Sequence, residues 1–165
     1  MGIFTSFMLV TQIFTGSLFW DKDKAPDIMI CNNSGASVYR VKKAVSYWQS
    51  LGYSFGSVYK VSRDNISCIT GIPLYSTIMI DIPSQGFNFG KHLGTTKTWW
   101  LTNSGEILKA KIEIQPGWEL SERVIEHEIG HALGFKDNSI VGHMMNGAWI
   151  KGGYKKKGLQ RPETN

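Results

Sequence analysis

The chain has 165 residues, enough for one domain with a buried core. Hydrophobic residues make up 42% and charged residues 19%, a globular balance that excludes an intrinsically disordered chain. The formal net charge is +5, and residues 151–165 carry five basic residues against one acidic residue, or +4. Because this basic tail lacks the repeated aromatic residues on which bases stack, we interpret it as a solvated end and expect no nucleic-acid partner.

The first 20 residues are uncharged and largely apolar. They have no basic start or small-residue cleavage site, and several polar residues dilute them below a typical membrane span. An export segment, an anchor and a packed first element therefore all stay open. We divide the chain into an uncertain N-terminal segment (1–25), a main domain (26–150) and the tail (151–165). The two cysteines, Cys31 and Cys68, fit either one disulfide or two buried thiols.

The predicted elements upstream of residue 120 are one helix and several strands. A buried strand at 26–31 precedes a helix that starts at Val38, repeats apolar residues at helical spacing and stops at Gly52. Further strands are predicted at 56–62, 76–82, 98–102 and 106–115, with a glycine-rich loop over 85–97.

The stretch "HEIGHALGFKD", residues 127–137, predicts a metal-binding helix. We expect Ser121 to cap this helix and Leu120 to pack on Ile125 as a hydrophobic staple. His127 and His131 are four residues apart, so both imidazoles project from one face and can bind one zinc ion. Glu128 stands beside that ion, where a general base could take a proton from an activated water.

A third ligand is expected after the helix. Gly134 permits the left-handed conformation that ends the helix and turns the chain, which brings Asp137 back toward the histidines. A carboxylate oxygen can bind zinc in place of a third imidazole and leaves a fourth position for water. His143 is the rival third ligand, and we favour Asp137. We expect His92 to be a loop histidine.

The pattern His127, Glu128, His131, Gly134, Asp137 resembles the metzincin clan of zinc endopeptidases. Its aspartate resembles the small snapalysin-type members, and "GHMMN" (142–146) resembles the clan's methionine turn. In matrixin-like members the methionine lies eight residues past the third ligand, which implies Met145. The resemblance implies an α+β, zincin-like fold: a twisted mixed sheet with an antiparallel edge strand, packed on two main helices, with the active-site helix below the cleft.

These residues predict a zinc metalloendopeptidase with Zn²⁺ as cofactor and a protein or peptide as substrate. Zinc would activate a water and polarise the scissile carbonyl, and Glu128 would be the general base. Substrate would pair with the edge strand 98–102, where Trp99 or Trp100 could contact it.

The alternative function is a catalytically silent metzincin-fold binding or structural module. We expect a monomer at a secreted, surface or virion-associated location rather than in the cytoplasm, and the sequence leaves membrane association open.

Overall fold

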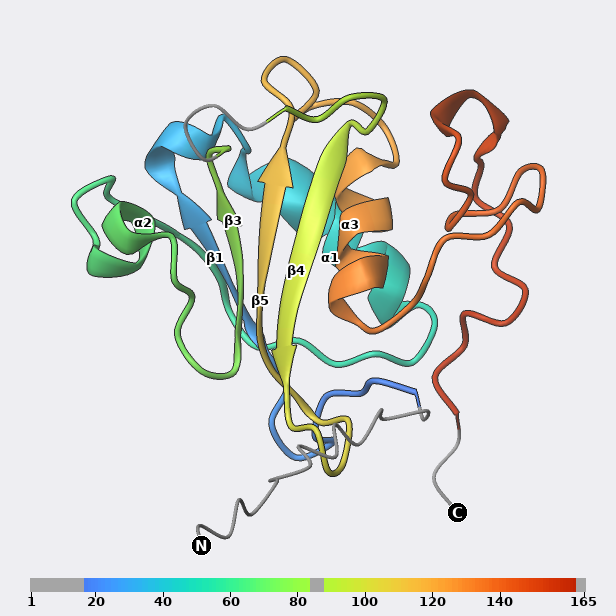
Figure 1. Cartoon of the computed structure of the whole chain (residues 1–165), viewed down its shortest axis with the longest axis horizontal. Coiled ribbons are helices and arrows are strands. Elements are labelled where there is room, and N and C mark those ends of the chain that lie inside the picture. The colour runs from blue at the N-terminus through green and yellow to red at the C-terminus, as the bar shows by residue number, and fades with distance from the viewer. Residues whose placement is uncertain (1–16, 84–87, 163–165) are drawn as a thin grey trace, which may run out of the picture.

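A computed structural model of the chain describes residues 17–83 and 88–162 and contains a five-stranded mixed sheet with few helices (Figure 1). The strand order is β2-β1-β3-β5-β4, and only β4 runs antiparallel to its neighbour. The strands are β1 (Asp27–Cys31), β2 (Val58–Val61), β3 (Thr77–Asp81), β4 (Gly94–Trp100) and β5 (Ile107–Ile114). The helices are α1 (Val38–Gln49), α2 (Ile66–Thr70), α3 (Val124–Ala132) and the short 3₁₀ turns η1 (Asn32–Ser34) and η2 (Trp149–Lys151).

Two helices, α1 and α3, cover one face of the sheet, and α1 lies behind the sheet in the view of Figure 1. Successive side chains of a strand point to opposite faces, so alternate isoleucines of β1 and β3 pack against these helices with the fully buried Trp48. Met29 and Met79 occupy the other face, where α2 covers them. Burial on both faces is what makes the central parallel strands continuously apolar.

The sequence placed most of these elements within a few residues of their observed bounds, but the edge strand starts earlier than predicted. β4 begins at Gly94 inside the stretch 85–97 that we expected to be a loop, because residues 94–100 pair with β5 in register from Gly94 opposite Ile114. Helix α2 was not expected at all. It has five residues, with Asn65 accepting from Ser67 N at its start and a left-handed Gly71 at its end.

The start of α3 also differs from the prediction. Arg123, at φ 67°, precedes the helix without a side-chain cap, and Leu120 is 67% exposed, so Ser121 is no cap and the expected staple is absent. Arg40 of α1 takes over this role. Its buried guanidinium donates to the Glu126 carboxylate and to the Ser121 carbonyl. The first turn of α3 is therefore held by a buried ion pair to α1 instead of by a local cap.

The described N-terminal end packs on α3 and beside β5, and the C-terminal end reaches the main core. Trp20 donates its indole N–H to the Ala132 carbonyl, 2.8 Å away, and Phe19 forms a β-bridge with Glu106. Leu159, from the stretch expected to be a solvated tail, is 2% exposed in the main core. The expectations for residues 1–16 lie outside the described residues. Within residues 17–83 and 88–162, none of the helices has the length and apolarity needed to cross a bilayer.

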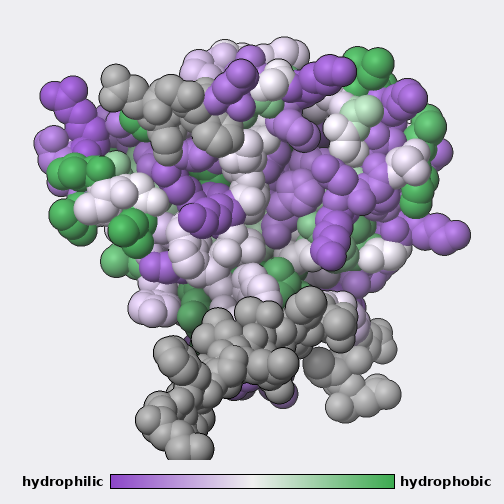
Figure 2. Space-filling model, viewed as in Figure 1, coloured by the Kyte–Doolittle hydropathy of each residue, from purple (hydrophilic) through white to green (hydrophobic). Residues whose placement is uncertain are grey.

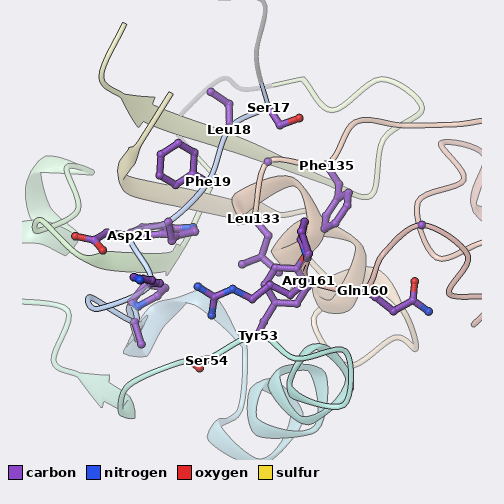
Figure 3. A pocket seen from close by; sticks show the side chains of 17 residues that line it. Ser17, Leu18, Phe19, Asp21, Tyr53, Ser54, Leu133, Phe135, Gln160 and Arg161 are labelled. Carbon is purple, nitrogen blue, oxygen red and sulfur yellow. The ribbon is translucent and has the colours of Figure 1, made fainter. Parts of the chain in front are cut away.

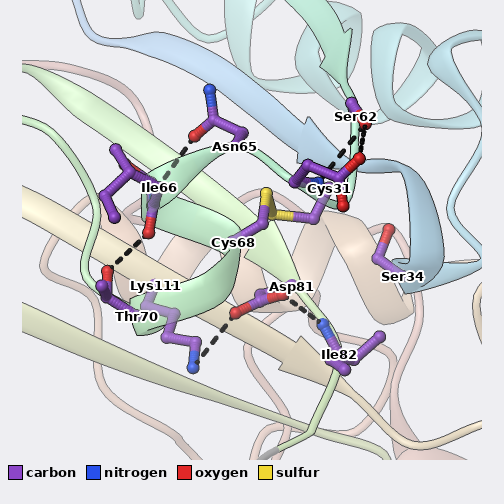
Figure 4. The surroundings of a disulfide bond; sticks show 12 residues. Cys31, Ser34, Ser62, Asn65, Ile66, Cys68, Thr70, Asp81, Ile82 and Lys111 are labelled. Atoms are coloured by element: carbon purple, nitrogen blue, oxygen red, sulfur yellow. Dashed lines mark hydrogen bonds and ion pairs between the residues drawn. A yellow bond between two sulfur atoms is a disulfide. The ribbon is translucent and has the colours of Figure 1, made fainter.

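One disulfide joins Cys31 at the end of β1 to Cys68 in α2, which decides between the two states that the sequence left open (Figure 4). Both sulfurs lie in the smaller core between the sheet and α2, beside Met29 and Met79. The bond closes a loop with a sequence separation of 37 residues and fixes α2 on the sheet.

We expect the double variant Cys31→Ala/Cys68→Ala to lower the free energy of unfolding by about 2–4 kcal/mol, because the open loop gains conformational entropy in the unfolded chain. Urea unfolding of the oxidised protein and the variant measures the difference. A reducing agent should destabilise the wild type by a similar amount and leave the variant unchanged. Equal stability of oxidised protein and variant would contradict this role.

Candidate metal centre

The two histidines of α3 present the same ring nitrogen to one point. Their Nε2 atoms are 3.1 Å apart, as the spacing of four residues predicted. His127 Nδ1 lies 2.9 Å from the Met144 carbonyl, and His131 Nδ1 lies 2.8 Å from the Phe135 carbonyl. A carbonyl can only accept, so each Nδ1 carries the hydrogen and each neutral ring keeps its lone pair on Nε2. Both rings are thus oriented as metal ligands.

The turn after α3 carries the chain back toward these rings. Gly134 has a φ of 100°, and the Phe135 N–H donates to Gly130 O while the Gly134 N–H donates to His131 O. This pair of bonds is a Schellman motif, as a glycine in this position predicts. A side chain at Gly134 would also meet Leu18 O at 2.6 Å. The same turn supplies the Phe135 carbonyl that orients His131.

Asp137 completes the cluster. Its Oδ1 lies 3.2 Å from His127 Nε2 and 3.5 Å from His131 Nε2. Ligand atoms held about 2.0–2.1 Å from a tetrahedral zinc ion are about 3.3 Å apart. The three gaps of 3.1, 3.2 and 3.5 Å lie on either side of that value. These donors therefore fit a single ion. Among the described residues, His127, His131 and Asp137 form the group of side chains that could together hold a metal ion.

His143, the rival third ligand, points into the protein instead. It is 2% exposed, and the Met145 N–H donates to its Nδ1 at 3.1 Å. Its Nε2 lies 2.9 Å from the Lys157 carbonyl, to which it must donate. With both ring nitrogens engaged, His143 has no lone pair to offer a metal. The exposed loop residue His92, by contrast, lies where we expected it.

The segment 144–146 packs against α3 and helps to position His127 and Asp137. Met145 is 1% exposed, and its sulfur occupies the space that a Cβ on Gly130 would need, in the last turn of α3. The Met145 carbonyl accepts from Asn138 N at 2.7 Å, next to Asp137. Together with the bond from Met144 O to His127, these contacts tie two of the three donors to one segment.

Glu128 lies between the cluster and the edge strand. It is 4% exposed, and the Thr96 hydroxyl of β4 donates to its Oε2 at 2.6 Å. Burial raises the pKa of the Glu128 carboxyl, while the bond from Thr96 and the charges of His131 and His127 oppose the rise. A Cβ on Gly94 would come within 2.8 Å of Glu128 Cγ, so the strand packs directly on this side chain. Sequence reasoning missed Thr96 because it lay in the predicted loop.

The two tryptophans of β4 are placed differently. Thr96 faces α3, so Lys97 and Trp99 point to the opposite face of the sheet, where Lys97 Nζ lies 5.0 Å from the Trp99 ring. Trp99 therefore lies on the opposite side of the sheet from the candidate metal centre, which does not support the expected contact with a substrate. Trp100 follows a break in the pairing register and is half-buried opposite Ile107.

An apolar cavity of about 660 Å³ lies behind the turn that follows α3 (Figure 3). The N-terminal segment contributes Leu18 and Phe19, the turn contributes Leu133 and Phe135, and Tyr53 comes from the chain after α1. None of the cluster residues lines it. The cavity is thus separate from the candidate metal centre.

No family model matches the chain, and no curated protein matches it in sequence. Among solved structures, the chain is similar to High choriolytic enzyme 1, a hatching enzyme zinc-protease from Oryzias latipes (medaka fish). The identity is 16% and the TM-score 0.34, with 76% of this chain and 53% of that chain covered. The chain thus spans about half the length of that enzyme, and the similarity is too low to assign a family.

We expect Asp137→Ala to lower the zinc bound per chain well below that of the wild type, because a neutral methyl leaves only the two histidines as donors. His143→Gln is the matched comparison and should keep the metal, since it alters a buried side chain that faces away from the cluster. Metal content after dialysis, measured by atomic emission alongside circular dichroism, compares the two. Loss of zinc from His143→Gln with retention in Asp137→Ala would mean that the third ligand is misassigned.

Proposed function

We propose that the chain is a zinc-dependent endopeptidase of the metzincin type, with His127, His131 and Asp137 as metal ligands. The observation that carries the proposal is the convergence of three donor atoms, 3.1–3.5 Å apart, beside a buried carboxylate on the same helix. On this reading, Met145 is the methionine of the clan's characteristic turn, which its packing against Gly130 supports.

The proposed mechanism gives separate roles to the metal ion, to Glu128 and to the carbonyls that hold the histidines. A bound zinc ion would polarise the scissile carbonyl and lower the pKa of a water molecule. Glu128 would accept a proton from the attacking water on its carboxylate and pass it to the leaving amine. Its burial supports that role, because a desolvated carboxylate is a stronger base than an exposed one. The carbonyls of Met144 and Phe135 would hold the imidazoles in place through the reaction.

Strand β4 offers an outer edge with which an extended peptide substrate could pair. It is the last strand of the sheet, so its outer edge has no strand partner among the described residues. A peptide that pairs with this edge would lie alongside Glu128, which β4 contacts through Thr96. We propose a protein or peptide as the substrate on this basis.

The second candidate function is a binding module without turnover. The intact Glu128 and its bond to Thr96 favour the enzyme, because a silent module has no need of a buried carboxylate at this position. The Cys31–Cys68 disulfide supports our proposal of a secreted, surface or virion-associated location, since such bonds persist in oxidising environments.

The decisive variant is Glu128→Gln, which keeps the shape of the side chain and removes the base. We expect zinc content to remain while cleavage of an unfolded protein such as reduced casein falls by about 10²–10⁴-fold. A chelator should abolish the activity of the wild type, and added zinc should restore it. Turnover by Glu128→Gln at the wild-type rate would disprove the mechanism, and absence of cleavage by the zinc-loaded wild type would favour the binding module.

Thr96 should position the base without touching the substrate. We expect Thr96→Val to lower kcat by about 10–100-fold, the rate equivalent of one hydrogen bond to a charged group, with a smaller change in KM. Thr96→Ser keeps the hydroxyl and should recover most of the activity, which a purely structural role for the side chain would not predict. Zinc content and thermal unfolding of both variants are the controls. Equal kcat in Thr96→Val and wild type would contradict this role.

A further inference from the structure

Five large apolar side chains are exposed together on and after α2, and we name them the α2 patch. They are Ile66, Ile69, Ile72, Leu74 and Tyr75, with exposed fractions of 66, 65, 54, 53 and 71%. Single exposed apolar residues are ordinary, but five within ten residues are not. Figure 2 shows hydrophobic side chains gathered at the left of the molecule, where Figure 1 places α2.

The orientation of α2 keeps this patch in solvent. The inward side of the helix is formed by Ser67 and Cys68, which are 1% and 9% exposed, and the disulfide to Cys31 fixes it there (Figure 4). The buried Ser67 hydroxyl has no hydrogen-bond partner among the described residues. A helix with its serine inside and its isoleucines outside is reversed relative to what folding alone favours. Exposed isoleucines in such an arrangement are typical of a surface that contacts another molecule.

A cationic and aromatic border adjoins the patch on the open face of the sheet. Lys109 Nζ lies 5.3 Å from the Tyr75 ring and 5.4 Å from the Trp99 ring, and Lys97 approaches Trp99 from its own strand. A shallow hollow joins this border to Ile69 and Ile72.

The acidic residues of the same hollow do not cancel this positive charge. Asp81 and Glu113 are 3% and 8% exposed, and both pair with Lys111, at 3.3 and 2.8 Å. Lys97 is exposed and Lys109 half-buried. The outward charge of the border is therefore positive.

We infer that the α2 patch and its border bind an anionic lipid membrane. Isoleucine and leucine side chains would enter the boundary between headgroups and acyl chains, with Trp99 and Tyr75 at the interface and Lys97 and Lys109 near the phosphates. A nucleic acid would use the lysines and aromatic rings but would leave the isoleucines in water. The metal centre lies beside α3 on the other face of the sheet, so a membrane-bound molecule keeps it open to solvent. The inference does not depend on the proposed proteolysis.

The test is co-sedimentation of the full chain with vesicles of phosphatidylcholine alone or with 30% phosphatidylserine. We expect binding to the anionic vesicles that weakens in 0.5 M salt, and little binding to the neutral ones. Ile69→Ser/Ile72→Ser should reduce partitioning at least tenfold, because two large apolar side chains would no longer leave water on binding. Lys97→Gln/Lys109→Gln should reduce it about tenfold or more, because two positive charges near the anionic headgroups are lost.

Two controls separate this surface from the other candidates on the chain. Ile150→Ser removes a side chain that is 88% exposed but lies in η2, and Lys156→Gln/Lys157→Gln removes charge from the basic tail. Both should bind as the wild type does. Thermal unfolding checks each variant, and Leu74→Ser replaces the double isoleucine variant if that one is destabilised.

Several results would overturn the inference. Wild-type binding by the isoleucine variant would mean that another part of the chain contacts the lipid. Loss of binding only in the tail variant would move the site to residues 156–157. Absence of vesicle binding together with a DNA mobility shift that requires Lys97 and Lys109 would assign the border to nucleic acid.

Discussion

Gly130 has no side chain, and the sulfur of Met145 fills the space where one would lie. This close approach holds the segment after the Schellman turn against the last turn of α3. From there the Met144 carbonyl reaches His127, and the Met145 carbonyl holds Asn138 next to Asp137. A larger residue at 130 would push the segment away and separate the donors. The geometry of the candidate metal centre thus depends on one contact in the apolar core.

The same helix is fixed at both of its ends by groups from distant parts of the chain. Arg40 binds Glu126 and the Ser121 carbonyl at the start, and Trp20 binds the Ala132 carbonyl at the end. Trp48 adds a bond from its indole to the Glu126 carbonyl, 2.8 Å away. A helix of nine residues is marginal in isolation, so these tertiary contacts stabilise the surface that carries the histidines.

Side-chain identity and spacing predicted the donors but not their surroundings. A spacing of four residues places two histidines on one face of a helix, and a glycine three residues after the second histidine predicts the turn that brings the aspartate back to them. The carbonyls of Met144 and Phe135 could not be predicted, because every residue has a carbonyl and only the fold decides which one meets an imidazole. Ser121 had a capping sequence, yet the buried Arg40–Glu126 pair was the stronger interaction at that end. Likewise, the glycine-rich composition predicted a loop around Thr96, whereas pairing with β5 makes this stretch a strand.

Charge gives a further reason to expect a cation at the cluster. Glu128 and Asp137 are both acidic, and the charge of Asp137 raises the pKa of Glu128 further. The charged and titratable groups that act on Glu128 are the two histidines and Asp137, with neither lysine nor arginine among them in the described part of the chain. Two ionised carboxylates this close repel each other, and the burial of Glu128 adds a desolvation cost to its charged form. A divalent ion held by His127, His131 and Asp137 would offset that repulsion and stabilise both carboxylates in their charged form.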